Sequence, residues 1–480
     1  MTPHIKRLDQ YRLEISPAYK PGMNGSAIIY ADAAIERFIE PAALDQAANT
    51  ATLPGLAGSA LAMPDIHTGY GFPIGGVAAY DAHDGVISPG GVGYDINCGV
   101  RLLSSSLEVK ALGKKLEDLA HKLYAGIPAG VGAGGGLRLN RREQDSPLID
   151  GAAWAVKNGL GRQEDLEHAE SGGALAGADP RAVSARALER GRDQLGTLGS
   201  GNHFLEVQEV TDIFDEDAAR AYGIFKGQLT VMLHTGSRGL GHQVCTDFIG
   251  LMKDAARRYG IALADPQLAA APFRSAEGQQ YFGAMQAAAN YAWANRQALT
   301  GLMRDIFEKS LGLGENALGL RLVYDVAHNI AKLEEHEAGG KKTSVIVHRK
   351  GATRAFGPGH PELPAAYSAT GQPVIIPGDM GRCSYLLAGT AKAMSDTFGS
   401  CCHGAGRLMS RGEAVRRARG RLIAEELAAK GIWVRSSGHE TLSEEMPEAY
   451  KDVEDVVGVV AGAGLARRVA RFRPLIVIKG

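Results

Sequence analysis

A glycine-rich segment at residues 91–100 carries one carboxylate and one thiol, Asp95 and Cys98, three positions apart. Its glycine content argues against a regular helix or strand, so its backbone can approach a ligand closely and direct both side chains toward one point. An oxygen donor beside a sulfur donor favours a transition metal over calcium or magnesium. The pair alone is equally compatible with a turn aspartate beside a small buried cysteine, so further ligands are required.

Four histidines could supply those further ligands. His203 follows a glycine–serine turn and opens an apolar run, and His403 lies in a tight glycine loop. His234 and His328 each end a strand-like segment. Functional side chains of α/β proteins gather at such positions because a rigid scaffold can aim them. Each histidine alone is more often an ordinary half-buried residue, but the four beside the carboxylate and thiol predict a metal centre.

The composition is that of a globular enzyme rather than of a linker or membrane protein. The chain has 480 residues, 45% of them apolar, and its 63 glycines cluster around the histidines. A net charge of −1 gives no overall basic field, so a nucleic acid would have to be met by local patches. Five cysteines do not make a disulfide framework, and no signal or membrane-spanning segment is evident. We therefore expect a cytoplasmic protein.

The elements that must position these residues follow from sequence patterning. Strands are expected near residues 321–326, 343–348, 372–376 and 473–478. Helices are expected over 107–125 and 181–195, as a long amphipathic helix over 279–309, and over 410–430, where Ser410 and Glu413 form a capping-box signal.

Together these elements predict a mixed α/β (α+β) fold. We expect a single large domain over residues 1–480, with a central mixed β-sheet core, surrounding helices and a metal site at strand exits. A two-lobed version is the alternative. The polar, glycine-rich segment 158–180 is the best candidate for a mobile insertion.

Several longer segments carry a resemblance to one known family. They are residues 63–76, beginning Met-Pro-Asp-Ile-His-Thr-Gly-Tyr, residues 89–101, Pro-Gly-Gly-Val-Gly-Tyr-Asp-Ile-Asn-Cys-Gly-Val-Arg, and residues 194–204, Gln-Leu-Gly-Thr-Leu-Gly-Ser-Gly-Asn-His-Phe, with shorter matches at 234–241, 328–332, 348–356, 403–407 and 477–480. They closely resemble the RtcB family of RNA-splicing ligases and follow that family's order from about residue 60 to the end. Chance does not explain a match of segments this long and specific.

The resemblance implies an activity and a metal content. It implies a GTP-dependent ligase that joins an RNA 3′-phosphate, or a 2′,3′-cyclic phosphate, to a 5′-hydroxyl in tRNA splicing or RNA repair. It also implies two Mn²⁺ ions, the first of which would be held by Asp95, Cys98 and His203. Cys98 would act as a bridging thiolate and hold the second ion with His234 and His328.

The resemblance also assigns the nucleophile and a guanylate pocket. His403 would receive the guanylate, and Asp65 is a candidate partner for its proton-bearing nitrogen. The pocket would comprise Asn202, His203, Phe204, Leu205, Glu206, His328, Asn329, Pro377, Gly378, Asp379, Met380, Ser384, His403, Gly404, Ala405, Gly406 and Lys479. One departure is Asp379, where the family usually has serine, followed by Arg382, where a small residue is common. This departure bears on the affinity for the nucleotide and on which nucleotide the pocket selects.

The RNA contacts and the alternatives are less sharply defined. Candidate contacts to RNA phosphates are Arg190, Arg238, Arg407 and Arg411, although solvated surface explains most of them equally well. The archease protein, which activates some relatives, is a candidate partner. A metal-dependent phosphoesterase acting on cyclic or terminal RNA phosphates, a ligase paralogue with an altered substrate, and a non-catalytic RNA-binding protein are the alternative functions. Zinc suits cysteine and histidine ligands at least as well as manganese does.

Overall fold

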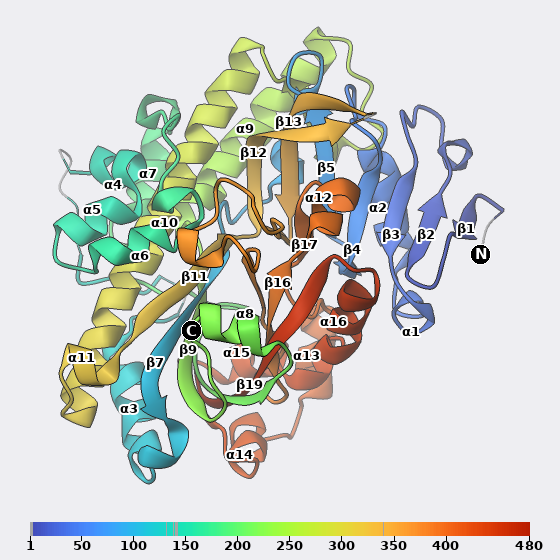
Figure 1. Cartoon of the computed structure of the whole chain (residues 1–480). Coiled ribbons are helices and arrows are strands. Elements are labelled where there is room, and N and C mark those ends of the chain that lie inside the picture. The colour runs from blue at the N-terminus through green and yellow to red at the C-terminus, as the bar shows by residue number, and fades with distance from the viewer. Residues whose placement is uncertain (1–2, 131, 138, 140–142, 339) are drawn as a thin grey trace.

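Two large mixed β-sheets form the core of the computed structural model, which describes residues 3–130, 132–137, 139, 143–338 and 340–480 (Figure 1). In spatial order the first sheet contains β1 (Ile5–Arg7), β2 (Arg12–Ile15), β3 (Ala27–Tyr30), β4 (Ala60–His67), β5 (Ile74–Asp81), β13 (Lys341–Lys350) and β12 (Asn329–Ala338). The second contains β11 (Arg321–Ala327), β7 (Gly99–Glu108), β9 (Gln228–Thr235), β8 (Phe204–Ile213), β19 (Ala466–Lys479), β16 (Ser384–Gly389) and β15 (Pro373–Ile376), with β18 (Trp433–Ser436) beside β19.

At one place along the chain, a single residue separates a strand of the second sheet from a strand of the first. β11 ends at Ala327 in the second sheet and β12 begins at Asn329 in the first, so His328 lies at the junction. A short strand pair, β14 (Ala352–Arg354) with β17 (Ser400–Cys402), lies nearby, and β6 (Val86–Ile87) pairs with β10 (Ala271–Pro272). Most neighbouring strands are antiparallel, whereas β3 with β4 and β18 with β19 are parallel, which makes both sheets mixed.

Helices surround this core, as Figure 1 shows. They are α1 (Ala33–Glu36), α2 (Pro41–Thr50), α3 (Lys115–Gly126), α4 (Asp145–Asp150), α5 (Ala152–Lys157), α6 (Gln163–Glu167), α7 (Ala185–Gly191), α8 (Glu216–Ala221), α9 (Arg238–Arg258), α10 (Ala276–Leu311), α11 (Glu315–Leu318), α12 (Ala391–Thr397), α13 (Arg411–Arg417), α14 (Ile423–Ala428), α15 (His439–Glu444) and α16 (Val453–Gly462). The expected mixed α/β class with a sheet core and surrounding helices is confirmed. None of the helices within the described residues is both long enough and apolar enough to cross a bilayer.

The four strands expected at 321–326, 343–348, 372–376 and 473–478 are present as β11, β13, β15 and the end of β19. The expected long helix is also present, as α10, but the prediction that it is amphipathic is wrong for its central turns. Residues 283–300 are all buried, because α3, α4, α5, α9 and β12 pack around them. Polar side chains in this stretch, such as Asn290 and Arg296, are satisfied by internal hydrogen bonds.

Three expected helices have different bounds. The stretch 107–125 begins as strand, because β7 continues to Glu108 and α3 starts only at Lys115. The stretch 181–195 contains the end of a short 3₁₀ helix, Pro180–Ala182, and then α7, which Ser184 caps by accepting the Ala187 N–H. The stretch 410–430 is two helices, α13 and α14, because Gly420 between them adopts a φ of +76° that a helix does not allow.

The segment 158–180 is attached to the core by buried ion pairs. Asp165, in α6, pairs with Arg304 of α10 at 2.6 Å, and Glu170 pairs with Lys332 of β12 at 3.0 Å. Both carboxylates are buried, with 1% of their residue surface exposed. These contacts define where the segment lies, and its mobility stays a prediction.

Candidate metal centre and nucleotide pocket

The candidate metal ligands lie where the strands of the second sheet end on one side. Because neighbouring strands are antiparallel, some strands begin on this side and others end there. β9 ends with His234 and Thr235, and β11 runs directly into His328. Cys98 immediately precedes β7, and His203 immediately precedes β8. In the strand register Ala327 faces Gly99, Gly99 faces Thr235, and His234 faces Phe204. The site therefore lies at strand beginnings as well as at the expected strand exits.

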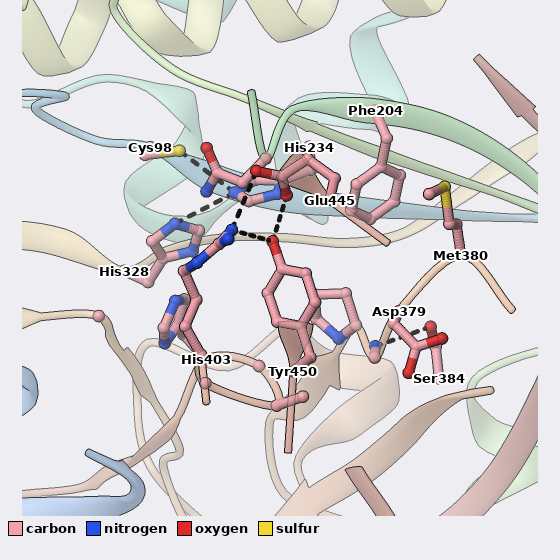
Figure 2. A pocket seen from close by; sticks show the side chains of 18 of the residues that line it. Cys98, Phe204, His234, His328, Asp379, Met380, Ser384, His403, Glu445 and Tyr450 are labelled. Carbon is pink, nitrogen blue, oxygen red and sulfur yellow. Dashed lines mark hydrogen bonds and ion pairs between the residues drawn. The ribbon is translucent and has the colours of Figure 1, made fainter. Parts of the chain in front are cut away.

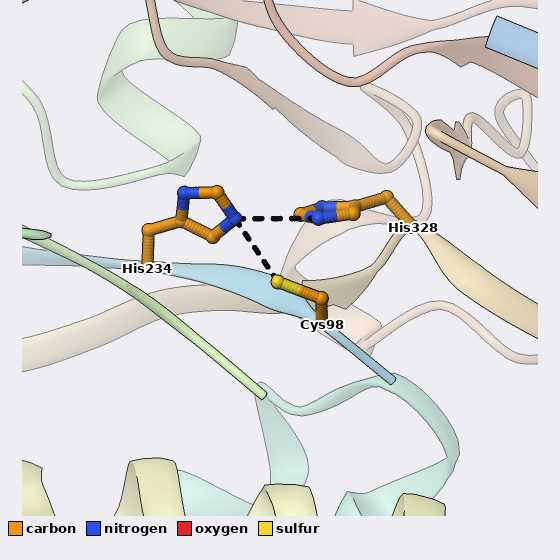
Figure 3. Close-up of side chains that lie close together, drawn as sticks. All are labelled: Cys98, His234 and His328. Carbon is orange, nitrogen blue, oxygen red and sulfur yellow. Dashed lines mark hydrogen bonds between the residues drawn. The ribbon is translucent and has the colours of Figure 1, made fainter. Parts of the chain in front are cut away.

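Two groups of donor atoms share the Cys98 sulfur. One group is Asp95, Cys98 and His203, the other is Cys98, His234 and His328, and the donor atoms within each group lie within 4.8 Å of one another. The Cys98 Sγ is 3.3 Å from the His203 Nε2 and 3.2 Å from the His234 Nε2. Figure 3 shows the Cys98, His234 and His328 side chains converging, with 3.3 Å between the two Nε2 atoms.

These spacings suit bound ions. Two nitrogens each about 2.1 Å from one ion at a tetrahedral angle lie about 3.4 Å apart, and a nitrogen–sulfur pair about 3.6 Å apart. The observed nitrogen–nitrogen distance of 3.3 Å is close to the first value, whereas the sulfur–nitrogen distances of 3.2 and 3.3 Å are somewhat shorter than the second. Burial lowers the pKa of His234 and His328 well below the usual value, so both imidazoles are neutral, which is the ligand form. Burial raises the pKa of the Cys98 thiol, so binding a cation there releases a proton.

A buried arginine holds the backbone around this centre. Arg296 of α10 donates from Nη1 to the Asn97 carbonyl at 2.7 Å and to the Thr235 carbonyl at 3.0 Å. Asp325 of β11 accepts from its Nη2 at 2.8 Å and also pairs with the buried Arg101 at 2.7 Å. Asn97 has a φ of +50°, which places Cys98 directly after a left-handed turn. One guanidinium therefore links the chain before Cys98 to the chain after His234.

His403 lies beside this centre, in the loop after β17. Its ring centroid is 4.7 Å from that of His328. Asp65, in β4 of the first sheet, accepts from the His403 backbone N–H at 3.1 Å, and its Oδ2 is 2.7 Å from the His403 Nδ1. The Asp65 side chain is fully buried. This pairing assigns the proton to Nδ1 and leaves a free lone pair on Nε2.

A cavity of about 280 Å³ extends from the donor groups into the region between β8, β19 and β16 (Figure 2). It is lined by His67, Ile74, Asp95, Cys98, Asn202, Phe204, Glu206, His234, His328, Asn329, Gly351, Pro377, Gly378, Asp379, Met380, Ser384, His403, Gly404, Ala405, Gly406, Arg407, Arg411, Glu445, Tyr450, Val477 and Lys479. Most of the expected guanylate residues are in this lining. Two of them are not. His203 belongs to the donor group with Asp95 and Cys98, and alternation along β8 turns the Leu205 side chain into the core.

Charged groups in the cavity differ strongly in their surroundings. Burial, with a smaller contribution from the Asp379 charge, raises the pKa of Glu206 to about 8, although the Gln208 hydrogen bond and the Lys479 charge oppose the shift. The Lys479 Nζ lies 5.9 Å from the centre of the Phe204 ring and donates to the Gly201 carbonyl at 3.0 Å. Aromatic, cationic and protonatable carboxyl groups therefore face one volume, a combination that suits a purine base.

Asp379, at the position where the resemblance led us to expect serine, is paired with Arg382. The Arg382 Nε lies 3.2 Å from the Asp379 Oδ2, and the Gly381 N–H donates to the Asp379 Oδ1 at 2.9 Å. Burial nevertheless raises the Asp379 pKa to about 6. Asp379 and Arg382 therefore form one ion pair, of which Asp379 lines the cavity.

The four candidate phosphate-binding arginines separate into two sets. Arg407 and Arg411 line the cavity, where Arg407 donates to Glu445 at 3.0 Å. Arg238 lies at the metal centre, with its Nη1 3.0 Å from the His203 Nδ1. Arg190 lies outside the cavity and donates to Gln243 at 2.9 Å.

Six cavity residues were absent from the sequence-based set, namely His67, Ile74, Gly351, Glu445, Tyr450 and Val477. His67 lies within the segment 63–76 and could have been included on that ground. Glu445 and Tyr450 belong to no recognisable motif. Both accept hydrogen bonds from Arg407, which also lines the cavity, at 3.0 Å for Glu445 and 3.2 Å for the Tyr450 hydroxyl.

Two donor groups that could hold metal ions lie beside an imidazole paired with a buried carboxylate and open into one cavity, which is the arrangement of a candidate metalloenzyme. The family model described as tRNA-splicing ligase RtcB matches residues 46–480, and the chain belongs to the RtcB family. The chain is 55% identical over 476 residues to a protein of Archaeoglobus fulgidus and 54% identical over 477 residues to one of Thermococcus kodakarensis. Each match covers 99% of this chain and 99% of the relative, and both relatives are named tRNA-splicing ligase RtcB. A relative of the same name from Pyrococcus furiosus is 56% identical over 385 residues, which are 80% of this chain and 40% of that protein. The resemblance seen in the sequence is thereby confirmed.

Proposed function

We propose that this protein is a GTP-dependent RNA ligase that joins 3′-phosphate or 2′,3′-cyclic phosphate ends to 5′-hydroxyl ends through a guanylylated histidine. The observation that carries the proposal is the position of His403. Its Nδ1 is 2.7 Å from the buried Asp65 carboxylate, and its ring lies beside His328 of the candidate metal centre. Simple hydrolysis of RNA phosphates requires no such oriented nucleophile, which disfavours the phosphoesterase alternative.

The chemistry assigned to His403 follows from its proton arrangement. A neutral imidazole whose Nδ1–H is held by a carboxylate presents Nε2 as a nucleophile at neutral pH. Attack by Nε2 on the α-phosphorus of GTP forms a P–N bond, and pyrophosphate departs. The Asp65 carboxylate stabilises the positive charge that develops on the ring, as a buried carboxylate does for other catalytic histidines.

Two further displacements complete the reaction. An oxygen of the RNA 3′-phosphate attacks the guanylate phosphorus, and the bond to His403 breaks to give an RNA–diphosphate–guanosine intermediate. The 5′-hydroxyl then attacks the RNA phosphorus, loses its proton, and GMP departs. The guanylate makes the RNA phosphate a good electrophile because GMP is a better leaving group than oxide. A cyclic end must first be hydrolysed to the 3′-phosphate.

We propose that the two donor groups hold two Mn²⁺ ions. Asp95, Cys98 and His203 would hold one ion, and Cys98, His234 and His328 the other, with the Cys98 sulfur shared. Bound ions of this kind stabilise charge on phosphoryl oxygens and align the attacking and leaving groups. The choice of manganese over zinc rests on the family and not on the ligand types. Because zinc suits cysteine and histidine ligands at least as well, excess zinc is expected to displace manganese and inhibit.

The guanylate pocket is assigned to the cavity beside His403. Phe204 and Lys479 offer a ring and a cation to the base, and Glu206 offers a carboxyl group to its N–H donors. Gly404 and Gly406 flank the phosphate position, where backbone N–H groups can approach closely. RNA as the substrate, archease as a partner and a cytoplasmic location complete the proposal.

The deciding experiment is covalent labelling of the protein. Wild type, His403→Ala and the surface control His83→Ala are incubated with Mn²⁺ and α-labelled GTP and separated on a denaturing gel. We expect an acid-labile label on wild type and on the control but not on His403→Ala, and its loss when RNA with a 3′-phosphate is added. Absence of label on a metal-loaded wild-type protein, with and without archease, would refute the ligase proposal.

A further inference from the structure

One buried lysine, Lys451, donates to the two carbonyls that flank Asp65. Its Nζ is 3.0 Å from the Pro64 carbonyl oxygen and 2.7 Å from that of Ile66. The residue is 1% exposed and does not line the cavity, although Tyr450 directly before it does. Lys451 therefore contacts the stretch of chain that carries Asp65 from outside the space for a nucleotide.

Strand pairing does not hold this stretch of β4. The ladder with β3 ends at Ala62, and the ladder with β5 is interrupted between Ala62 and His67. The residues between these two positions have no partner in either ladder. Buried carbonyl groups need a hydrogen-bond partner, and the ammonium of Lys451 supplies one to both carbonyls beside Asp65. It thus does for this stretch what a neighbouring strand does for the rest of β4.

The Asp65 carboxylate is a buried charge with few local partners. Its side chain is fully buried, its Oδ2 accepts from His403, and its Oδ1 has no hydrogen-bond partner among the residues that the structure describes. A buried charge is costly unless an opposite charge balances it. Burial lowers the pKa of Lys451 to about 8, although the Asp65 and Glu40 charges oppose this shift, so the amine is mainly protonated at pH 7. Its positive charge therefore lies where it can balance Asp65.

The backbone at Lys451 also holds the loop that carries His403. The Lys451 N–H donates to the Gly406 carbonyl at 3.0 Å. Gly406 in turn packs against Asp65, because a Cβ added to this glycine would lie 2.3 Å from the Asp65 carbonyl oxygen. The segment at Lys451, the loop after His403 and the Asp65 stretch of β4 therefore form one region of contact.

A purely structural role explains the lysine less well. A buried ammonium loses its hydration, and replacing buried charges by apolar side chains of similar size is often neutral or stabilising. Packing alone would therefore favour an apolar side chain at this position. An apolar side chain would supply neither the two hydrogen bonds nor the positive charge beside Asp65, and these are the properties that a fixed, ionised carboxylate requires.

We infer that Lys451 is a positioning residue for guanylylation, which fixes the Asp65 stretch and balances the Asp65 charge so that the carboxylate keeps the proton of His403 on Nδ1. The inference rests on the proposed ligase function. Lys451 lies outside the cavity and acts through Asp65. Without its ammonium, Asp65 holds the imidazole less firmly, and the Nε2 lone pair faces the nucleotide less often.

The first test replaces Lys451 by methionine, which removes the charge and both hydrogen bonds but keeps a side chain of similar length. Single-turnover guanylylation is measured with Mn²⁺ and saturating labelled GTP, and the affinity for GTP is measured separately. We expect the rate to fall by roughly 10- to 150-fold, the effect of losing a hydrogen bond to a charged group. The affinity should stay within about threefold of wild type, because Lys451 does not line the cavity. Lys430→Met, at an exposed lysine after α14, is the control and should match wild type.

A double-mutant cycle with Asp65→Asn separates positioning from a general loss of structure. If Lys451 acts through Asp65, adding Lys451→Met to Asp65→Asn should lower the rate by less than about threefold further. Losses that multiply, an unchanged rate in Lys451→Met alone, or a loss confined to GTP affinity would each overturn the inference. If Lys451→Met does not fold, Lys451→Gln, which keeps an amide donor but no charge, takes its place in the same cycle with the same expected result.

Chemical modification of His403 gives a readout that needs no nucleotide. Diethyl pyrocarbonate acylates the free lone pair of a neutral imidazole, and its rate at His403 is followed by mass spectrometry of the peptide. We expect this rate to be at least about threefold lower in Lys451→Met, with the exposed His83 unchanged as internal reference. Equal rates at His403 in both proteins would overturn the inference. If the expected difference appears but wild type forms no guanylate, the ligase proposal fails while the role of Lys451 stands.

Discussion

Replacing Asp65 by asparagine tests the assignment of His403 most directly. The change keeps the shape of the side chain but removes the charge that orients the imidazole. Asp65 Oδ2 accepts two hydrogen bonds from His403, at 2.7 Å from Nδ1 and 3.1 Å from the backbone N–H. A hydrogen bond to a charged group contributes about 1.5–3 kcal/mol, which corresponds to roughly 10- to 150-fold in rate.

The full effect of Asp65→Asn is expected to be larger. An amide NH₂ turned toward Nδ1 would shift the imidazole proton to Nε2 and remove the attacking lone pair. The corresponding change in a serine protease triad lowers turnover by about 10⁴-fold. We therefore expect the rate of guanylylation to fall by about 10²- to 10⁴-fold. The affinity for GTP should change little, because Asp65 is fully buried and does not line the cavity.

The assay is single-turnover guanylylation with saturating labelled GTP and Mn²⁺, quenched over time. Asp84→Asn, at an exposed aspartate, is the matched control, and melting temperature and metal content show whether each variant is intact. A rate for Asp65→Asn within about threefold of wild type, in a folded and metal-loaded protein, would mean that His403 is oriented by something else. Equal loss in the control would point to a general defect.

Three further predictions concern the metal centre and its surroundings. Cys98→Ser removes the shared sulfur, so bound manganese measured by mass spectrometry should fall by at least half; unchanged content would exclude a bridging thiolate. Burial raises the Glu206 pKa from 4.5 to about 8, so folded protein keeps a proton that the unfolded chain releases, and stability falls as pH rises between these values. Glu206→Gln should flatten this fall, seen as melting temperature at pH 5 and pH 8; parallel curves would contradict the shift. Gly99→Ala places a Cβ 2.5 Å from the Val326 carbonyl and should cost about 1–3 kcal/mol of stability and weaken metal retention, unlike Gly250→Ala, which meets nothing.

The sequence was sufficient to predict the centre of the site but not its outer wall. Asp95, Cys98 and the histidines lie in glycine-rich loops at strand ends, and such loops are visible in a sequence because their composition is unusual. Glu445 and Tyr450 reach the cavity through Arg407, in a region with no distinctive composition. Their position depends on long-range packing that local patterns do not encode.

The fold was predictable at the level of class and strand position. Buried strands were recognised because their apolar runs are short and bounded by glycine. The burial of the centre of α10 was missed, because Asn290 and Arg296 read as a polar face although they bond internally. A polar residue indicates a solvent-exposed position only when the interior offers it no hydrogen-bond partner. Here the partners, such as the Asn97 carbonyl, lie far away in sequence and cannot be recognised from the local pattern.

The junction of the two sheets explains why metal binding and stability should be linked. Donors from the second sheet meet His328, the single residue between β11 and β12, while Asp65 in the first sheet orients His403 against that same ring. An ion shared by Cys98, His234 and His328 would therefore tie strand ends of one sheet to the start of the other. Because those donors converge only in the folded chain, the binding free energy of the ion adds to the stability of the fold. The arrangement that places His403, the proposed nucleophile, is thus also the one that a bound metal would stabilise.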